Sequence, residues 1–226
     1  MYTFVIFLSE FLILFFLSRN LLTLFQRNIF KFIKHKTIAT YLFAFLFLPG
    51  TLIHELSHYL FAKILFVRTG GISLLPKHLD LENGYTQIIF GHAKIGESDI
   101  FRRFLIGISP VITGIALIIG SLYFVNSKNY LDTWPGIFLM AYFIFEIGNT
   151  MFSSHEDMKG SWKVFLIFAV AVIAVYLLGI KITIQNEALF EAIKKANIYL
   201  LWPIVIDGAL LGFFKVLSTS LQKAEH

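Results

Sequence analysis

Five consecutive residues carry the chemistry that this sequence suggests most strongly: His54-Glu55-Leu56-Ser57-His58. If the segment is helical, His54 and His58 stand at positions i and i+4 on one face, where both imidazoles can bind the same zinc ion. Glu55 follows the first ligand and can take a proton from a water molecule on that metal. This H-E-x-x-H spacing therefore predicts a hydrolytic zinc site, with one Zn²⁺ per chain.

The motif lies within an apolar segment, residues 38–66. Ionisable side chains inside a membrane span are costly, and by default they indicate function. The alternative interpretation is a pair of histidines packed against polar groups in a helix bundle, which needs a wet helix face. Aromatic and aliphatic residues on both sides of the motif leave little such face. The context therefore favours the metal site.

The composition indicates a membrane protein. Of the 226 residues, 57% are hydrophobic and only 15% are charged, with a mean hydropathy of +0.75. A soluble domain of this length cannot hide so much apolar surface. We expect an integral, multi-pass protein of the cell membrane. Its net charge of +5 suits the anionic headgroups of a lipid bilayer better than a nucleic-acid partner. Because the chain has no cysteine, His, Asp or Glu must hold any metal.

Apolar segments long enough to cross a hydrocarbon core recur along the chain. They predict an all-α polytopic membrane protein with about six transmembrane helices, at residues 2–25, 38–66, 104–125, 134–152, 162–184 and 198–217. The basic connector at residues 27–36 has interleaved apolar side chains and predicts a short interfacial helix. Residues 185–197 predict a polar connector with helical character. Pro49-Gly50, one turn before His54, predicts a kink or break in the second span.

Residues 68–103 differ from the apolar spans. Gly70-Gly71 opens one β-prone stretch, and Asn83-Gly84 separates it from another, which is a hairpin signal. We expect a small β-hairpin at residues 70–91, inserted after the second span. It is either an ordinary loop outside the membrane or an edge strand, within residues 72–90, that holds a substrate in extended form.

These features divide the chain into three parts. Residues 1–37 hold the first span and the basic connector. Residues 38–165 form the expected metalloprotease core, with three spans and the hairpin. Residues 166–226 hold the C-terminal spans.

A catalytic zinc usually has three protein ligands and one open position, so a third ligand must come from outside the motif. Five later side chains are candidates: His155, Asp157, Glu187, Glu191 and Asp207. Asp157 lies in a polar stretch that is tolerated at membrane depth only where it lines a cavity or is enclosed by protein. Asp207, in the middle of the sixth span, is better matched in depth to His54. The two glutamates would fit another class of membrane metalloprotease, whose third ligand is a glutamate on a later helix.

The motif within a membrane span, combined with Asn149 eight residues before Asp157, resembles the site-2 protease family of intramembrane zinc metalloproteases. The second motif of that family has an Asn, a Pro three residues later, an Asp eight residues after the Asn, and then a Gly. Asn149 and Asp157 match in identity and spacing, whereas Phe152 and Met158 stand at the Pro and Gly positions. The resemblance covers residues 40–165.

This resemblance implies that His54, His58 and Asp157 are the zinc ligands. It implies that Glu55 is the general base and Asn149 a substrate or oxyanion contact. The implied activity is hydrolysis of peptide bonds in membrane-protein substrates or membrane-span peptides, within or near the bilayer. Two alternatives stay open: an H-E-x-x-H membrane peptidase with a glutamate as third ligand, and a membrane metal-binding protein or transporter without proteolytic activity.

Overall fold

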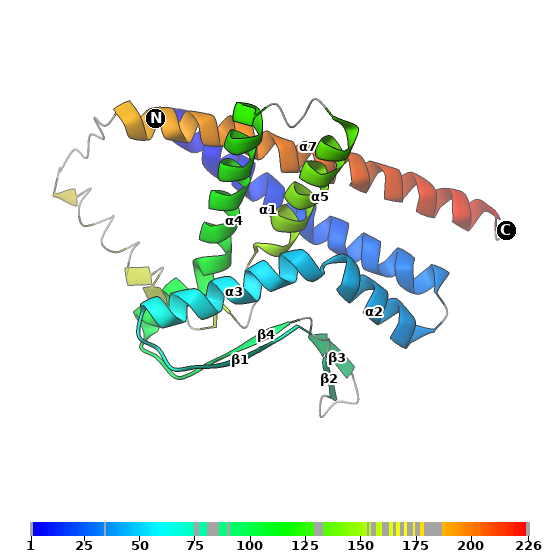
Figure 1. Ribbon diagram of the computed structural model, residues 1–226, viewed down its shortest axis with the longest axis horizontal. Coiled ribbons are helices and arrows are strands. Elements are labelled where there is room, and N and C mark those ends of the chain that lie inside the picture. The colour runs from blue at the N-terminus through cyan, green and yellow to red at the C-terminus, as the bar shows by residue number, and fades with distance from the viewer. Residues whose placement is uncertain are drawn as a thin grey trace.

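The computed structural model is mainly helical (Figure 1). It describes residues 2–33, 35–74, 77–80, 86–89, 91–128, 133–152, 154, 157–159 and 187–224, with scattered positions between 163 and 178. The helices are α1 (Tyr2–Phe32), α2 (Lys36–Leu46), α3 (Leu48–Ile64), α4 (Ile100–Lys128), α5 (Trp134–Thr150) and α7 (Glu187–Ala224). The strands are β1 (Thr69–Ser73), β2 (Lys77–Asp80), β3 (Thr86–Ile89) and β4 (His92–Ile95).

The main core lies where four helices meet. Leu14 of α1, Ile118 of α4, Ile144 of α5 and Leu200 of α7 are all fully or almost fully buried in one hydrophobic cluster. Helices α1 and α7 lie side by side, and α4 and α5 extend from this pair towards α3 (Figure 1). Removing these side chains from lipid and water into a close-packed interior fixes the relative positions of the helices that carry the site.

Three described helices are long and apolar enough to cross a membrane: α1, α4 and α7. The pair α2 and α3 makes a fourth candidate if the two helices form a single broken span. Helix α5 has 17 residues, fewer than the roughly 20 that a straight span needs. The described part of the chain therefore contains membrane-span-like helices, fewer than the six that the sequence predicts. The predicted fifth span, residues 162–184, lies largely outside the described residues.

The predicted break before the metal motif is confirmed. Helix α2 ends at Leu46, and α3 begins at Leu48 with its axis bent by 67°. Pro49 stands in the first turn of α3, where its missing N–H costs no intrahelical hydrogen bond. The break at Phe47 therefore starts a new helix at Leu48, six residues before His54.

Two boundary predictions are wrong. Residues 27–32, predicted as part of a separate interfacial helix, are the last turns of α1. Nothing between residues 25 and 32 breaks a helix, so α1 continues through the basic side chains. Residues 187–197, predicted as a polar connector with helical character, are helical, but they form the first turns of α7, which reaches the sixth predicted span without interruption.

The predicted hairpin is confirmed as an antiparallel β insertion between α3 and α4. Strand β1 pairs with β4, and β2 pairs with β3 further out. The register of β1 shifts at Gly70-Gly71, between the pairs Thr69–Ile95 and Ile72–Ala93, as a bulge requires. The turn predicted at residues 83–84 lies outside the described residues. Strands β1 and β4 contact α3, so the insertion covers one side of the motif helix (Figure 1).

Candidate metal centre

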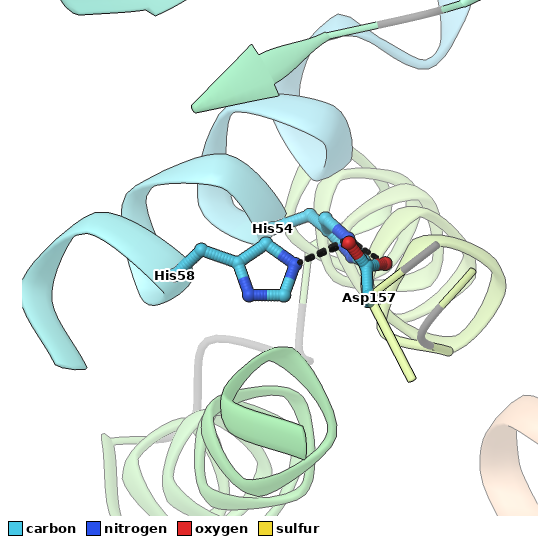
Figure 2. Close-up of side chains that lie close together, drawn as sticks. All are labelled: His54, His58 and Asp157. Atoms are coloured by element: carbon cyan, nitrogen blue, oxygen red, sulfur yellow. Dashed lines mark hydrogen bonds and ion pairs between the residues drawn. The ribbon is translucent and has the colours of Figure 1, made fainter. Parts of the chain in front are cut away.

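Helix α3 places the two histidines of the motif together. His54 and His58 are one turn apart, and their rings meet edge to face with centroids 4.8 Å apart. Their Nε2 atoms are separated by 3.2 Å. His58 is buried, and His54 is half-buried. The helical spacing predicted from the sequence is therefore present, with both rings turned towards the same point (Figure 2).

Backbone carbonyls on two other helices fix both imidazole rings. The Nδ1 atom of His54 lies 2.6 Å from the carbonyl oxygen of Thr150, at the end of α5. The Nδ1 atom of His58 lies 2.7 Å from the carbonyl oxygen of Ile106 in α4. A carbonyl oxygen can only accept, so each Nδ1 carries a proton, and Nε2 is the ring nitrogen of each histidine that is left to bind a metal ion. This is the arrangement that a metal-binding histidine requires.

Asp157 joins the histidines from a separate part of the chain. One carboxylate oxygen lies 3.3 Å from His58 Nε2, and the other lies 3.6 Å from His54 Nε2. The backbone N–H of Ser154 donates to this carboxylate at 2.6 Å, and the Ser154 hydroxyl accepts from the Asp157 backbone N–H. Gly107 of α4 admits the Asp157 backbone at close range, because a Cβ there would collide with the Asp157 carbonyl oxygen.

The Asp157 carboxyl is held in its ionised form. Burial alone would raise its pKa, but hydrogen bonding to His54 and His58, together with their charge, outweighs burial and holds the pKa far below its usual range. These hydrogen bonds require a proton between each histidine Nε2 atom and the Asp157 carboxylate. A metal cation at the centre would take the place of those protons, as a positive charge shared by the same three side chains.

The donor atoms lie close enough together to share one metal ion. At zinc–nitrogen distances of about 2.0–2.1 Å, two ligands of a tetrahedral ion lie about 3.3 Å apart. The contacts between the three side chains here are 3.2, 3.3 and 3.6 Å, and the last two end on different oxygens of the Asp157 carboxylate. His54, His58 and Asp157 can therefore hold one metal ion (Figure 2).

Glu55 lies on α3 beside the histidines, beneath the β insertion. Its side chain is buried, and the backbone of Ala93 in β4 hydrogen-bonds its carboxylate. Gly91, just before β4, has a φ of +78°, and a Cβ at this position would stand 3.0 Å from the Glu55 Oε1 atom. The close passage of β4 over the predicted base therefore depends on a residue without a side chain.

The carboxylate of Glu146 fastens the start of the motif helix. Its Oε2 atom accepts a hydrogen bond of 3.0 Å from the backbone N–H of Gly50, one of the first N–H groups of α3, which have no intrahelical partner. An acidic group at this end of a helix is also favoured by the helix dipole. Glu146 thus couples α5 to α3 one turn before His54.

The other residues predicted for the site lie elsewhere. Asn149 is buried at the end of α5, and its side-chain amide donates to Asp207 at 2.8 Å and to the carbonyl of Phe145 at 2.9 Å. Its predicted contact with substrate stays a prediction. Asp207 is fully buried on α7 and does not join the group of three donors. Glu187 and Glu191 are exposed at the start of α7, and His155 lies outside the described residues.

Sequence reasoning missed several groups that hold the centre. The carbonyls of Thr150 and Ile106 give no signal, because every residue has a carbonyl and only the fold selects these two. Ser109 donates to the Ile106 carbonyl at 2.7 Å, and the Ser109-Pro110 pair in an apolar span is a signal that could have indicated it. The partnership of Asn149 with Asp207 joins two residues that the sequence singled out separately.

Comparison of the chain with protein-family models, with curated proteins and with solved structures gives no match. The resemblance to site-2 proteases therefore stays a prediction that rests on the residues of the two motifs. Function must be argued from the geometry of the site.

Proposed function

We propose that this protein is a zinc metalloendopeptidase of the site-2 protease type. It would hydrolyse peptide bonds of membrane-protein substrates within or near the bilayer. One observation carries the proposal: three metal-binding side chains from distant parts of the chain converge next to a buried glutamate. His54 and His58 come from the motif helix, and Asp157 comes from the segment after α5. A metal carrier has no need of a carboxylate such as Glu55 directly beside its first ligand.

Each residue of the site has a chemical role in this proposal. His54, His58 and Asp157 hold the zinc, which when bound supplies a Lewis acid for the scissile carbonyl and lowers the pKa of its water. Glu55 takes a proton from the attacking water and gives it to the leaving amine. The water oxygen forms the new C–O bond, the peptide C–N bond breaks, and the products are a carboxylic acid and an amine. No redox partner is needed.

The surroundings of the site support a substrate that is itself embedded in lipid. Large apolar side chains are exposed along α1, α4 and α7, where a soluble protein would carry polar ones. A multi-pass arrangement in the cell membrane, with the predicted fifth span included, would place these surfaces against lipid. Backbone groups of a helical substrate are shielded by their own hydrogen bonds, so the substrate segment should unwind before cleavage.

The β insertion is the candidate element for holding an unwound substrate. Strands β1 and β4 contact α3, and Ala93 of β4 reaches the Glu55 carboxylate. An extended peptide pairing with an edge of this ladder would run beside the motif helix.

A Glu55→Gln variant tests the proposal. It removes the base but keeps the size of the side chain, so the metal should remain bound while cleavage of a single-span reporter library in liposomes falls by at least about 100-fold. Glu97→Gln is the matched control, because Glu97 is exposed in the loop between β4 and α4. Full activity in Glu55→Gln, with activity abolished by His54→Ala, would disprove the assigned role of Glu55.

The alternative is a metal-binding membrane protein without proteolytic activity. The burial of Glu55 under β4 is the observation that favours it, because a base must reach water. The same experiment separates the two functions. A metal-binding protein without proteolytic activity would bind metal through His54 and His58, and its wild-type form would cleave no reporter.

A further inference from the structure

A buried polar connection leads from α7 to the candidate metal centre. Asp207 is fully buried in the apolar middle of α7, and it accepts a hydrogen bond of 2.8 Å from the side-chain amide of Asn149. Asn149 is also buried and lies at the end of α5, directly before Thr150. A carboxyl group placed among membrane-span helices is costly, and such a group is by default a functional residue.

The next link is the peptide that follows Asn149. Helix α5 ends at Thr150, so the Thr150 carbonyl has no partner within the helix and is free to accept from His54 Nδ1 at 2.6 Å. The backbone of Asn149 is held from another side, because the Ser18 hydroxyl of α1 donates to the Asn149 carbonyl at 3.3 Å. The last turn of α5 is thus fastened by side chains of two other helices.

The last turn of α5 also affects the position of Asp157, the third donor of the candidate metal centre. The chain leaves α5 after Thr150 and reaches Asp157 within seven residues, so the exit direction of α5 sets where that carboxylate arrives. Met151, the first residue beyond the helix, is buried and packs against α4, where a Cβ on Gly114 would collide with it. A shift in the end of α5 would therefore move the Thr150 carbonyl and the start of this segment together.

We infer that Asp207 is a positioning residue for the metal centre and acts through Asn149. Its hydrogen bond holds the end of α5, which in turn fixes the ring of His54 and the path to Asp157. Asp207 is fully buried and does not belong to the group of three donors, so we assign it a positioning role and not a catalytic one. The inference rests on the metal site of the proposed function, but not on proteolysis.

Cobalt binding provides a readout that is independent of activity. Full-length protein in detergent is stripped of metal, and its Co²⁺ affinity and visible absorption spectrum are measured. Partners that orient a metal ligand typically change metal affinity by about 10–100-fold when they are removed. We expect Asp207→Ala to weaken Co²⁺ binding within that range and to alter the absorption bands, which report the arrangement of the ligands.

Two further variants identify the mechanism. Asp207→Asn keeps an acceptor for the Asn149 amide, so we expect Co²⁺ affinity and spectrum close to those of the wild type. Asn149→Ala combined with Asp207→Ala should weaken Co²⁺ no more than either single change, because both act on one connection. The matched control is Asn197→Ala on the same helix. Asn197 is buried and donates to the Thr3 carbonyl at 3.0 Å, away from the connection.

Each outcome decides the inference. Weak Co²⁺ binding in Asp207→Ala, with rescue in Asp207→Asn and none of this loss in Asn197→Ala, supports it even if no reporter peptide is cleaved. Unchanged Co²⁺ binding in Asp207→Ala overturns it and leaves the proposed protease intact. Equal losses in Asp207→Ala and Asn197→Ala, or no rescue in Asp207→Asn, also overturn it. A wild-type protein whose Co²⁺ binding does not depend on His54 overturns both proposals.

Discussion

At the scale of single residues, the site depends on backbone carbonyls, which can only accept hydrogen bonds, and on glycines, which have no side chain. The carbonyls of Thr150 and Ile106 determine which ring nitrogen of each histidine carries the proton. No side-chain carboxylate could do this without adding another charge to a centre that already holds Asp157. Gly91 makes a similar contribution to Glu55, because it allows β4 to pass close to the carboxylate.

Replacing Gly91 by Ala tests this passage. The new Cβ would stand 2.7 Å from a Thr51 methyl carbon and 3.0 Å from Glu55 Oε1, and a non-glycine residue at a φ of +78° adds about 1–2 kcal/mol of strain. We expect β4 to move away from Glu55, so that reporter cleavage falls while zinc stoichiometry stays unchanged.

Gly71→Ala is the control for that change, since a Cβ at Gly71 meets nothing within 4 Å. It should cleave the reporter at the wild-type rate. Equal activity of the Gly91→Ala and Gly71→Ala proteins would show that the approach of β4 to Glu55 does not matter.

At the scale of elements, the contact between α3 and α5 brings together His54 of the motif and the Thr150 carbonyl that holds its ring. Glu146 binds the first turn of α3, and Thr150 binds the second through His54. Gly50 permits this contact, because a Cβ there would lie 2.7 Å from the Thr150 methyl group and 2.9 Å from the Glu146 carbonyl oxygen. The two helices are therefore held at a separation that leaves no room for a side chain.

Gly50→Ala should force α3 and α5 apart. Overpacking of this kind costs about 1–3 kcal/mol, and a larger separation would stretch the hydrogen bond between His54 and Thr150. We expect a lower melting temperature and weaker zinc binding, measured by thermal unfolding in detergent and by competition with a chelator.

The control for Gly50→Ala is Gly120→Ala in α4, where a Cβ meets nothing within 4 Å. Alanine favours a helix over glycine, so this variant should be at least as stable as the wild type and should keep its zinc affinity. If Gly50→Ala behaved like Gly120→Ala, close packing of α3 on α5 would not be required for the site.

At the scale of the whole molecule, the sequence predicts the parts better than their assembly. The H-E-x-x-H spacing, the break before it and the β insertion follow local rules of periodicity and turn chemistry, and the structure contains all three. The ends of α1 and α7 were misjudged, because basic and polar residues were assumed to mark a boundary although no helix breaker is present.

The assembly of the site depends on contacts that no local pattern records. His54 and Thr150 are 96 positions apart, and Asn149 and Asp207 are 58 apart. Asp157 was predicted as a ligand from the family spacing, and the structure brings it to the histidines. Only the packing of four helices shows which carbonyls hold the histidine rings. It also shows that Asp207 contacts Asn149 and is not one of the metal-binding side chains.

The central claim is that His54, His58 and Asp157 bind one zinc ion. X-ray absorption at the zinc edge, on full-length wild-type and Asp157→Ala proteins, tests it most directly. For the wild type we predict one zinc per chain, with two imidazole nitrogens at about 2.0–2.1 Å and a carboxylate oxygen at about 2.0–2.2 Å. Asp157→Ala should lose that oxygen and most of its zinc. Stoichiometric zinc with an unchanged ligand shell in Asp157→Ala would contradict the account.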